Sequence, residues 1–227
     1  MTKFRTNGSV LREVLSLEGL HVLDVGSGDG SLVRYLTRHG AHVTGLECGA
    51  AQLEKARSYP LEGDEVYVEG FGQDLPFEDA TFGTAIFSNS LHHIPAGHMM
   101  AALGEAARVI RPDGTVYVAE PIAAGSGFEV HAPIDDETDV RATAYDAIRR
   151  VADIGLREER EISFHTIYHY ADFDEMKDDT IRIDPTRREI IEAMEDDLRA
   201  IFDRLGVPDE KGMRFEQPMR VNVLRKS

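Results

Sequence analysis

The chain has 227 residues, of which 42% are hydrophobic and 29% carry a charge, and its formal net charge is -16. This composition is typical of a globular protein that is long enough to bury a large core. Because an acidic surface repels a phosphate backbone, we expect no nucleic-acid partner. The single cysteine, Cys48, excludes an intramolecular disulfide and any zinc site built from cysteines.

The amino-terminal residues 1–15 lack the basic and then apolar layout of a secretory signal. No apolar run approaches the ~20 residues that a membrane-spanning helix needs. We therefore expect a cytoplasmic protein that does not bind a membrane, and we leave a homodimer open.

Short apolar runs alternate with helical patterns between Leu20 and Glu120. The runs predict buried strands at residues 21–25, 42–46, 65–68, 84–88 and 115–120. Helices are predicted at residues 30–39, 50–59 and 95–110, with a turn at residues 111–114 ending the last of them. Such alternation predicts a mostly parallel sheet with helices on both faces, which binds ligands at the carboxyl ends of its strands.

The pattern changes after Glu120. A loop rich in glycine and proline is expected first, then a long helix, a strand, a charged helical segment and a last strand. The expected bounds are 121–133, 137–154, 160–170, 172–205 and 213–225, in that order. We predict a single α/β domain over residues 1–227, with a seven-stranded, mostly parallel sheet and a helical insert before the last strand.

A glycine-rich turn follows the first predicted strand. Gly26, Gly28 and Gly30 give the spacing G-x-G-x-G, whereas the dinucleotide fingerprint is G-x-G-x-x-G. Asp24 stands two residues before the first of them, where a carboxylate repels a diphosphate and attracts an ammonium group. The turn therefore favours a cofactor with an amino-acid head group over NAD.

Residues 22–31, VLDVGSGDGS, resemble motif I of the class I S-adenosylmethionine-dependent methyltransferases. Residues 72–82, 87–94 and 102–121 resemble later segments of that family in the right order. The resemblance implies a Rossmann-like fold with S-adenosyl-L-methionine as cofactor and S-adenosyl-L-homocysteine as product. It implies a cofactor-binding core at residues 20–120 and an acceptor side at residues 121–227. The insert at about residues 172–205 differs from a minimal member of the family, and it is either a helical decoration or a cover over the acceptor pocket.

The resemblance also implies roles for residues near the turn. Asp24, Gly26 and Gly28 would cradle the methionine part of the cofactor, and Ser27 and Asp29 would line the turn. Glu47 ends the second predicted strand, where its carboxylate can accept hydrogen bonds from both ribose hydroxyls. Cys48 would contact the adenine edge, and its alternative role is that of a small packed side chain. Ser88 and Asn89 would contact the cofactor ammonium.

The segment after the third predicted strand departs from the family. Phe71 stands where relatives often have an acid, and its ring could instead stack on adenine. Gly72 and Gln73 would then supply the polar contacts to the base, and the role of Asp74 stays open.

Candidate catalytic bases follow the fourth predicted strand. A histidine titrates near neutral pH and suits proton removal from a hydroxyl, so His92 and His93 are candidates, and we favour His93. Alternatively, the two histidines could cap or pack, or they could form part of a metal site with Asn89. We expect no metal. Some arginines could bind an acceptor carboxylate or form surface ion pairs: Arg141, Arg187, Arg188, Arg214 and Arg220.

These features predict methyl transfer to an oxygen or nitrogen of a small-molecule acceptor. A first alternative is a tRNA or protein methyltransferase, because residues 88–94 with residues 109–114 also resemble enzymes that act on modified wobble uridines. A second is a non-catalytic protein that binds S-adenosylmethionine, which the departure at Phe71 keeps open.

Overall fold

The computed structural model describes residues 4–227, which divide into two compact units. One, the core unit, comprises residues 7–120, 140–163 and 220–227. The other, the helical unit, comprises the described residues up to Thr6 together with residues 121–139 and 164–219. Residues 1–3 of the predicted single domain lie outside the described part, and the single domain itself stays a prediction.

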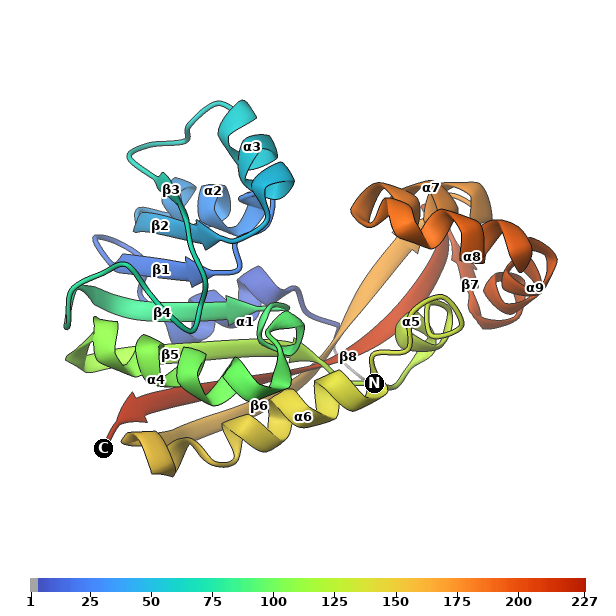
Figure 1. Ribbon diagram of the computed structural model, residues 1–227. Coiled ribbons are helices and arrows are strands. Elements are labelled where there is room, and N and C mark those ends of the chain that lie inside the picture. The colour runs from blue at the N-terminus through green and yellow to red at the C-terminus, as the bar shows by residue number, and fades with distance from the viewer. Residues whose placement is uncertain (1–3) are drawn as a thin grey trace. The chain divides into compact units, whose positions relative to one another are not determined.

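The strands form one sheet in the order β3-β2-β1-β4-β5-β8-β6, with β7 paired to β8. The registers of β1, β2, β3, β4 and β5 are parallel, whereas β7 and β8 are antiparallel. The sheet confirms the predicted Rossmann-like α/β class, and the short β7 is an addition to the seven strands expected. The strands are β1 (His21–Val25), β2 (His42–Glu47), β3 (Val66–Glu69), β4 (Phe82–Ser88), β5 (Ile110–Pro121), β6 (Leu156–Tyr170), β7 (Val207–Asp209) and β8 (Gly212–Lys226) (Figure 1).

Helices connect the strands much as the sequence predicts. The α-helices are α1 (Asn7–Val14), α2 (Ser31–Arg38), α3 (Ala50–Ser58), α4 (Met99–Val109), α5 (Ser126–Glu129), α6 (Thr138–Ile148), α7 (Phe173–Ile183), α8 (Arg188–Ala193) and α9 (Glu195–Leu205). Short 3-10 turns are η1 (Leu91–His93), η2 (Ala96–His98), η3 (Val151–Ile154) and η4 (Pro185–Arg187).

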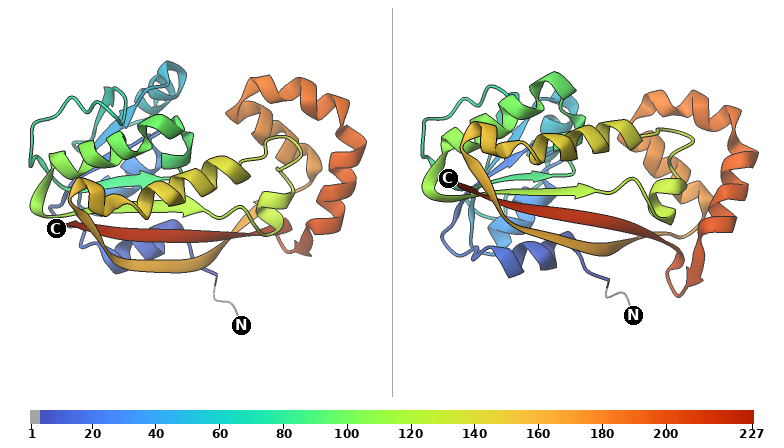
Figure 2. Two further views of the ribbon diagram at one scale, coloured as in Figure 1. Left: turned by 60° about the horizontal axis from the view of Figure 1, so that its bottom comes forward. Right: turned by 90° about the horizontal axis from the view of Figure 1, so that it is seen from below.

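The core unit buries apolar side chains between its sheet and its helices. Helix α4 and helix α6 cover one face of the sheet, and α1 covers the other (Figure 2). The small side chains of α4, such as Ala102 and Ala106, are fully buried and let the helix lie close to the strands. Val25 and Phe87 join the same hydrophobic cluster, so the strand ends that carry the glycine turn are held in a packed core.

The turn predicted at residues 111–114 lies inside β5 as an irregularity. Phe82 of β4 pairs with Ile110, but Thr84 pairs with Thr115, so β5 contains extra residues between these two pairs. A bulge of this kind bends a strand without ending it. Strand β5 therefore begins at Ile110, earlier than the position at which the sequence predicts it.

The helical unit has a hydrophobic core of its own. Helices α7, α8 and α9 fill most of the segment that was predicted to be helical, residues 172–205 (Figure 1). Phe173, Phe202 and Phe215 are buried together, and the ring of Phe202 lies 4.9 Å from that of Phe215. The loop predicted at residues 121–133 contains the one-turn helix α5.

Candidate functional site

The glycine turn has the backbone geometry that only glycine adopts without strain. Gly26, Gly28 and Gly30 have φ values of 75°, 54° and 75°. A Cβ atom at Gly26 would lie 2.7 Å from Cβ of Ser90, and one at Gly30 would lie 2.6 Å from the ring of Tyr67. A Cβ at Gly28 would meet no atom within 4 Å, so the backbone is open to a ligand at this position.

Glu47 braces this turn from the end of β2. One carboxylate oxygen accepts a hydrogen bond from the Gly28 N–H at 2.8 Å, and the other accepts from the Gly49 N–H at 2.7 Å. A carboxylate has about four acceptor positions, so both oxygens keep lone pairs for the hydroxyl groups of a sugar. The position predicted for ribose binding is therefore chemically suited to it.

Asp24 is buried at the end of β1, with an exposed fraction of 2%. Its register partners are Gly45 of β2 and Ile86 of β4. Burial, together with the negative charge of Glu47, raises the pKa of Asp24 to about 7. A ligand ammonium beside this carboxylate would favour the charged form and lower the pKa again.

A buried network that the sequence reasoning missed connects the ends of β4 and β5. One oxygen of Glu120 accepts from the backbone N–H groups of Ser90 and Leu91, at 3.2 and 2.9 Å, and the other bonds Nδ1 of His92. The Ser90 hydroxyl donates to the Val25 carbonyl at 2.6 Å. The sequence feature that could have revealed this network is Glu120 itself, an acid at the end of an apolar strand. A buried carboxylate there needs hydrogen-bond partners.

The two candidate bases differ in their surroundings. His92 is buried on Glu120, whereas His93 is exposed. Their ring centroids lie 4.1 Å apart. Of these two imidazoles, His93 is therefore the one that solvent and small molecules can approach.

The segment after β3 forms a tight turn at the same edge of the sheet. The Asp74 N–H donates to the Phe71 carbonyl at 3.1 Å, and the Phe71 side chain is 59% exposed. A Cβ at Gly72 would lie 3.0 Å from Val25, so the backbone there lies against the end of β1. Gln73 is half-buried between them.

The remaining predicted contacts lie at the ends of β2 and β4. Cys48 is exposed next to Glu47, and partial desolvation and that carboxylate raise the pKa of its thiol. A protonated thiol is a poor nucleophile. Ser88 pairs with Ala119 of β5, and the Asn89 N–H donates to the Ala119 carbonyl at 2.8 Å. Ser27 is buried beside the turn.

The structure therefore places the predicted residues at the carboxyl ends of parallel strands in the core unit. The pairs Asp24 with Ile86 and Ser88 with Ala119 align the ends of β1, β4 and β5. Glu47 lies at the end of β2, and Phe71 follows β3. This edge is where open α/β sheets bind their ligands.

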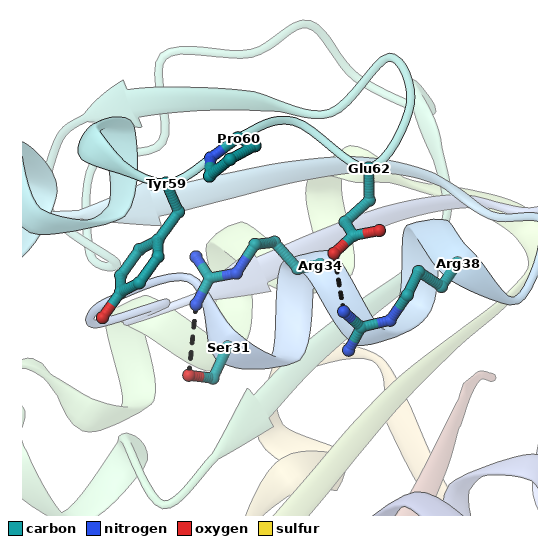
Figure 3. A pocket seen from close by; sticks show the side chains of 6 residues that line it. All are labelled: Ser31, Arg34, Arg38, Tyr59, Pro60 and Glu62. Carbon is teal, nitrogen blue, oxygen red and sulfur yellow. Dashed lines mark hydrogen bonds and ion pairs between the residues drawn. The ribbon is translucent and has the colours of Figure 1, made fainter.

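A separate cavity of about 360 Å³ lies beside α2. Figure 3 shows its lining: Ser31, Arg34, Arg38, Tyr59, Pro60 and Glu62. Arg34 lies over the Tyr59 ring at 4.2 Å and donates to the Asp29 carbonyl at 2.8 Å, and Arg38 pairs with Glu62 at 2.6 Å. Both guanidinium groups are thus engaged within the protein, and the lining contains none of the predicted site residues.

Comparisons with known proteins agree with this site. Residues 23–118 match the family model described as a methyltransferase domain. The O-methyltransferase resE of Aspergillus sclerotiorum is 36% identical over 110 residues, which are 46% of this chain and 41% of that protein. The glycine/sarcosine/dimethylglycine N-methyltransferase of Actinopolyspora halophila is 34% identical over 110 residues, 46% of this chain and 19% of that protein. The chain spans less than half the length of these curated relatives.

The fold is also found among solved structures. The cyclase SpnF aligns with a TM-score of 0.64 at 18% identity, over 99% of this chain and 86% of that one. A likeness at this identity concerns the fold alone.

The parallel sheet, the open glycine turn and the match over residues 23–118 agree in indicating an α/β domain similar to methyltransferases. The match of residues 23–118 to the methyltransferase-domain model implies S-adenosylmethionine as the cofactor of this part of the chain. Among residues 4–227, no helix is both long and apolar enough to span a membrane.

Proposed function

We propose that the protein transfers a methyl group from S-adenosylmethionine to an oxygen or nitrogen of a small-molecule acceptor. The observation that carries the proposal is the open backbone at Gly28, between the carboxylates of Asp24 and Glu47. This cradle fits an aminoacyl sulfonium nucleoside, because one acid suits the ammonium and the other suits the ribose.

The residues around this cradle would divide the work of binding. Asp24, Gly26, Ser27 and Gly28 would hold the methionine part, assisted by Ser88 and Asn89 at the end of β4. Glu47 and Cys48 would hold the ribose and the adenine edge. Phe71 would stack on the base, and Gly72, Gln73 and Asp74 would supply its polar contacts.

When bound, the cofactor supplies an activated methyl group on a sulfonium sulfur. The protein's own task is to align the acceptor atom with that carbon and to exclude water. His93 is the side chain that we assign to remove a proton from an acceptor hydroxyl, because it is exposed and close to the end of β4. His92 would act as a positioning residue, because Glu120 already bonds its Nδ1.

The named relatives support a small-molecule acceptor. One is named for transfer to oxygen, and the other for transfer to the nitrogen of glycine and its methylated derivatives. The net charge of -16 argues against a tRNA acceptor, which is one of the alternatives that the sequence allows.

Release of S-adenosylhomocysteine tests this function. We expect release with at least one member of a panel of phenols, catechols, hydroxy acids and amino acids, and none with tRNA at any salt concentration. Cofactor binding without release across the panel would instead support a non-catalytic binding protein. Release with tRNA or protein alone would overturn the small-molecule assignment.

A further inference from the structure

We propose that Arg220 recognises a carboxylate on the methyl acceptor, an inference that rests on the proposed function. Arg220 lies in the part of β8 that belongs to the core unit. Among residues 4–227 it has neither an ion pair nor a hydrogen bond, and its Nε is buried without an acceptor. Its Cζ lies 3.2 Å from the ring centroid of Tyr145.

This lack of a partner distinguishes Arg220 from the other arginines that the sequence offers as carboxylate binders. Arg187 pairs with Asp135 at 2.5 Å, Arg188 with Glu192 at 3.8 Å, and Arg214 with Glu216 at 3.8 Å. Arg141 also has an interaction partner. In a chain with a net charge of -16, an arginine without an ion pair is unexpected.

Two acids of β6 bond to Tyr145 and Asn222, and neither forms an ion pair with Arg220 among the described residues. One oxygen of Glu161 accepts from the Tyr145 hydroxyl at 3.0 Å and from the Asn222 amide at 2.9 Å. Glu158 accepts from the same amide at 2.9 Å. These bonds hold Tyr145 in place under the guanidinium while leaving the guanidinium N–H donors free.

The register of β8 places Arg220 at the functional edge of the sheet. The Ile122 N–H donates to the Pro218 carbonyl, and the Arg225 side chain reaches Thr115. Strands β5 and β8 are neighbours that run in opposite directions (Figure 1), and counting from either contact puts Arg220 opposite Glu120. The Glu120 oxygens bond Ser90, Leu91 and His92, and Glu120 forms no ion pair with Arg220 among the described residues.

The chemistry of this arrangement fits a carboxylate. A guanidinium presents parallel N–H donors that match the two oxygens of a carboxylate. Stacking on Tyr145 fixes the plane of the guanidinium before a ligand arrives, which reduces the entropy lost on binding. An acceptor with one carboxylate matches one unpaired arginine, whereas a polyanion would meet the acidic surface.

Titration calorimetry with matched acid and amide pairs tests the proposal. The probes are 4-hydroxybenzoate against 4-hydroxybenzamide, and sarcosine against sarcosinamide, added to the protein with and without saturating S-adenosylhomocysteine. We expect at least one acid to bind about tenfold to hundredfold more tightly than its amide. Arg220→Gln should remove that preference, Arg220→Lys should keep part of it, and affinity for the amide should change less than twofold.

Arg225→Gln is the matched control, because Arg225 lies on the same strand and pairs with Glu159 at 2.9 Å. It should leave the preference for the acid unchanged. If Arg220 only packs on Tyr145, Arg220→Gln will lower the melting temperature without changing the ratio of acid to amide affinity. That result, or no acid binding better than its amide, would overturn the proposal. Failure to bind S-adenosylmethionine would contradict the proposed function separately.

Discussion

At the scale of single residues, the buried carboxylate of Asp24 makes the stability of the protein depend on pH. Burial and Glu47 raise its pKa to about 7 from an ordinary value of 3.8. The folded protein therefore binds a proton more tightly than the unfolded chain. The resulting contribution to stability is fully present below about pH 4 and is lost as the pH rises through 7.

Asp24→Asn should remove this pH dependence, because asparagine stays neutral. Relative to the variant, the wild type should lose on the order of 4 kcal/mol of unfolding free energy between pH 4 and pH 8. Urea denaturation at several pH values measures the difference. Asp29→Asn is the control of opposite sign, because hydrogen bonds from Ser31 and the charge of Lys55 outweigh partial burial and lower the pKa of Asp29. A constant difference between wild type and Asp24→Asn would contradict the expected behaviour.

Glu120 should contribute to the stability of the fold, although no direct contact with the cofactor is assigned to it. Its carboxylate satisfies two backbone N–H groups and His92 in a buried setting. Glu120→Ala should cost about 2 to 4 kcal/mol, because it leaves two backbone N–H groups and the His92 ring buried without this partner. Chemical denaturation measures this cost. A loss below about 0.5 kcal/mol would show that the network is not maintained in solution.

His93 should affect turnover without affecting the fold. His93→Gln removes a base from an exposed position, so kcat for a hydroxyl acceptor should fall about hundredfold, with cofactor affinity unchanged. The rate of a reaction that needs an unprotonated base rises with pH, and the variant should lose that rise. Unchanged kcat, or an unchanged pH profile, would remove His93 from the reaction.

At the scale of elements, the beginning of α7 shows how local sequence fixes a helix. The Asp172 carboxylate accepts from the Glu175 N–H at 2.9 Å, and Glu175 accepts from the Ala171 N–H. This reciprocal capping satisfies N–H groups that a helix leaves unpaired at its start. It places Phe173 and Met176 in the core of the helical unit.

Asp172→Ala should therefore destabilise the helical unit by about 1 kcal/mol. Asp178→Ala, at an exposed position inside the same helix, should change stability by less than about 0.5 kcal/mol. Hydrogen exchange of residues 173–183, with unfolding followed by circular dichroism, compares the two variants. Equal effects would show that the cap does not stabilise α7.

Elements with strong periodicity were predictable, and those set by tertiary contacts were not. Strand β1 and helix α3 lie within a residue of their predicted bounds. The early start of β5 could not be seen, because residues 111–114 form a good local turn and only pairing of Ile110 with Phe82 extends the strand. Strand β7 is three residues long and exists only through its pairing with β8, and a segment that short has no readable pattern.

The candidate site divides in the same way. Gly28, Asp24 and Glu47 were visible because motif spacing places them at the ends of consecutive strands. Glu120 was not singled out, because its role depends on Ser90 and His92, which are distant in sequence. The lack of a partner at Arg220 likewise depends on where Tyr145 and Glu161 lie.

At the scale of the whole molecule, the match to known methyltransferases covers only part of the chain. The family match covers residues 23–118, which carry the predicted cofactor contacts. Arg220 and the helical unit both lie outside that match, so the proposal for acceptor recognition rests on the structure of this chain. The net charge of -16 also limits the kind of partner, because an acidic surface weakens the binding of polyanions.

Calorimetric titration with S-adenosylmethionine compares the wild type with Gly28→Ala and Gly19→Ala. Both glycines have positive φ and room for a Cβ, at 54° and 67°, so both substitutions strain the backbone, but only Gly28 belongs to the glycine turn. We expect the wild type and Gly19→Ala to bind one equivalent with similar affinity, and Gly28→Ala to bind at least about tenfold more weakly. No binding by the wild type, or equal binding by Gly28→Ala, would contradict the assignment of this turn to the cofactor.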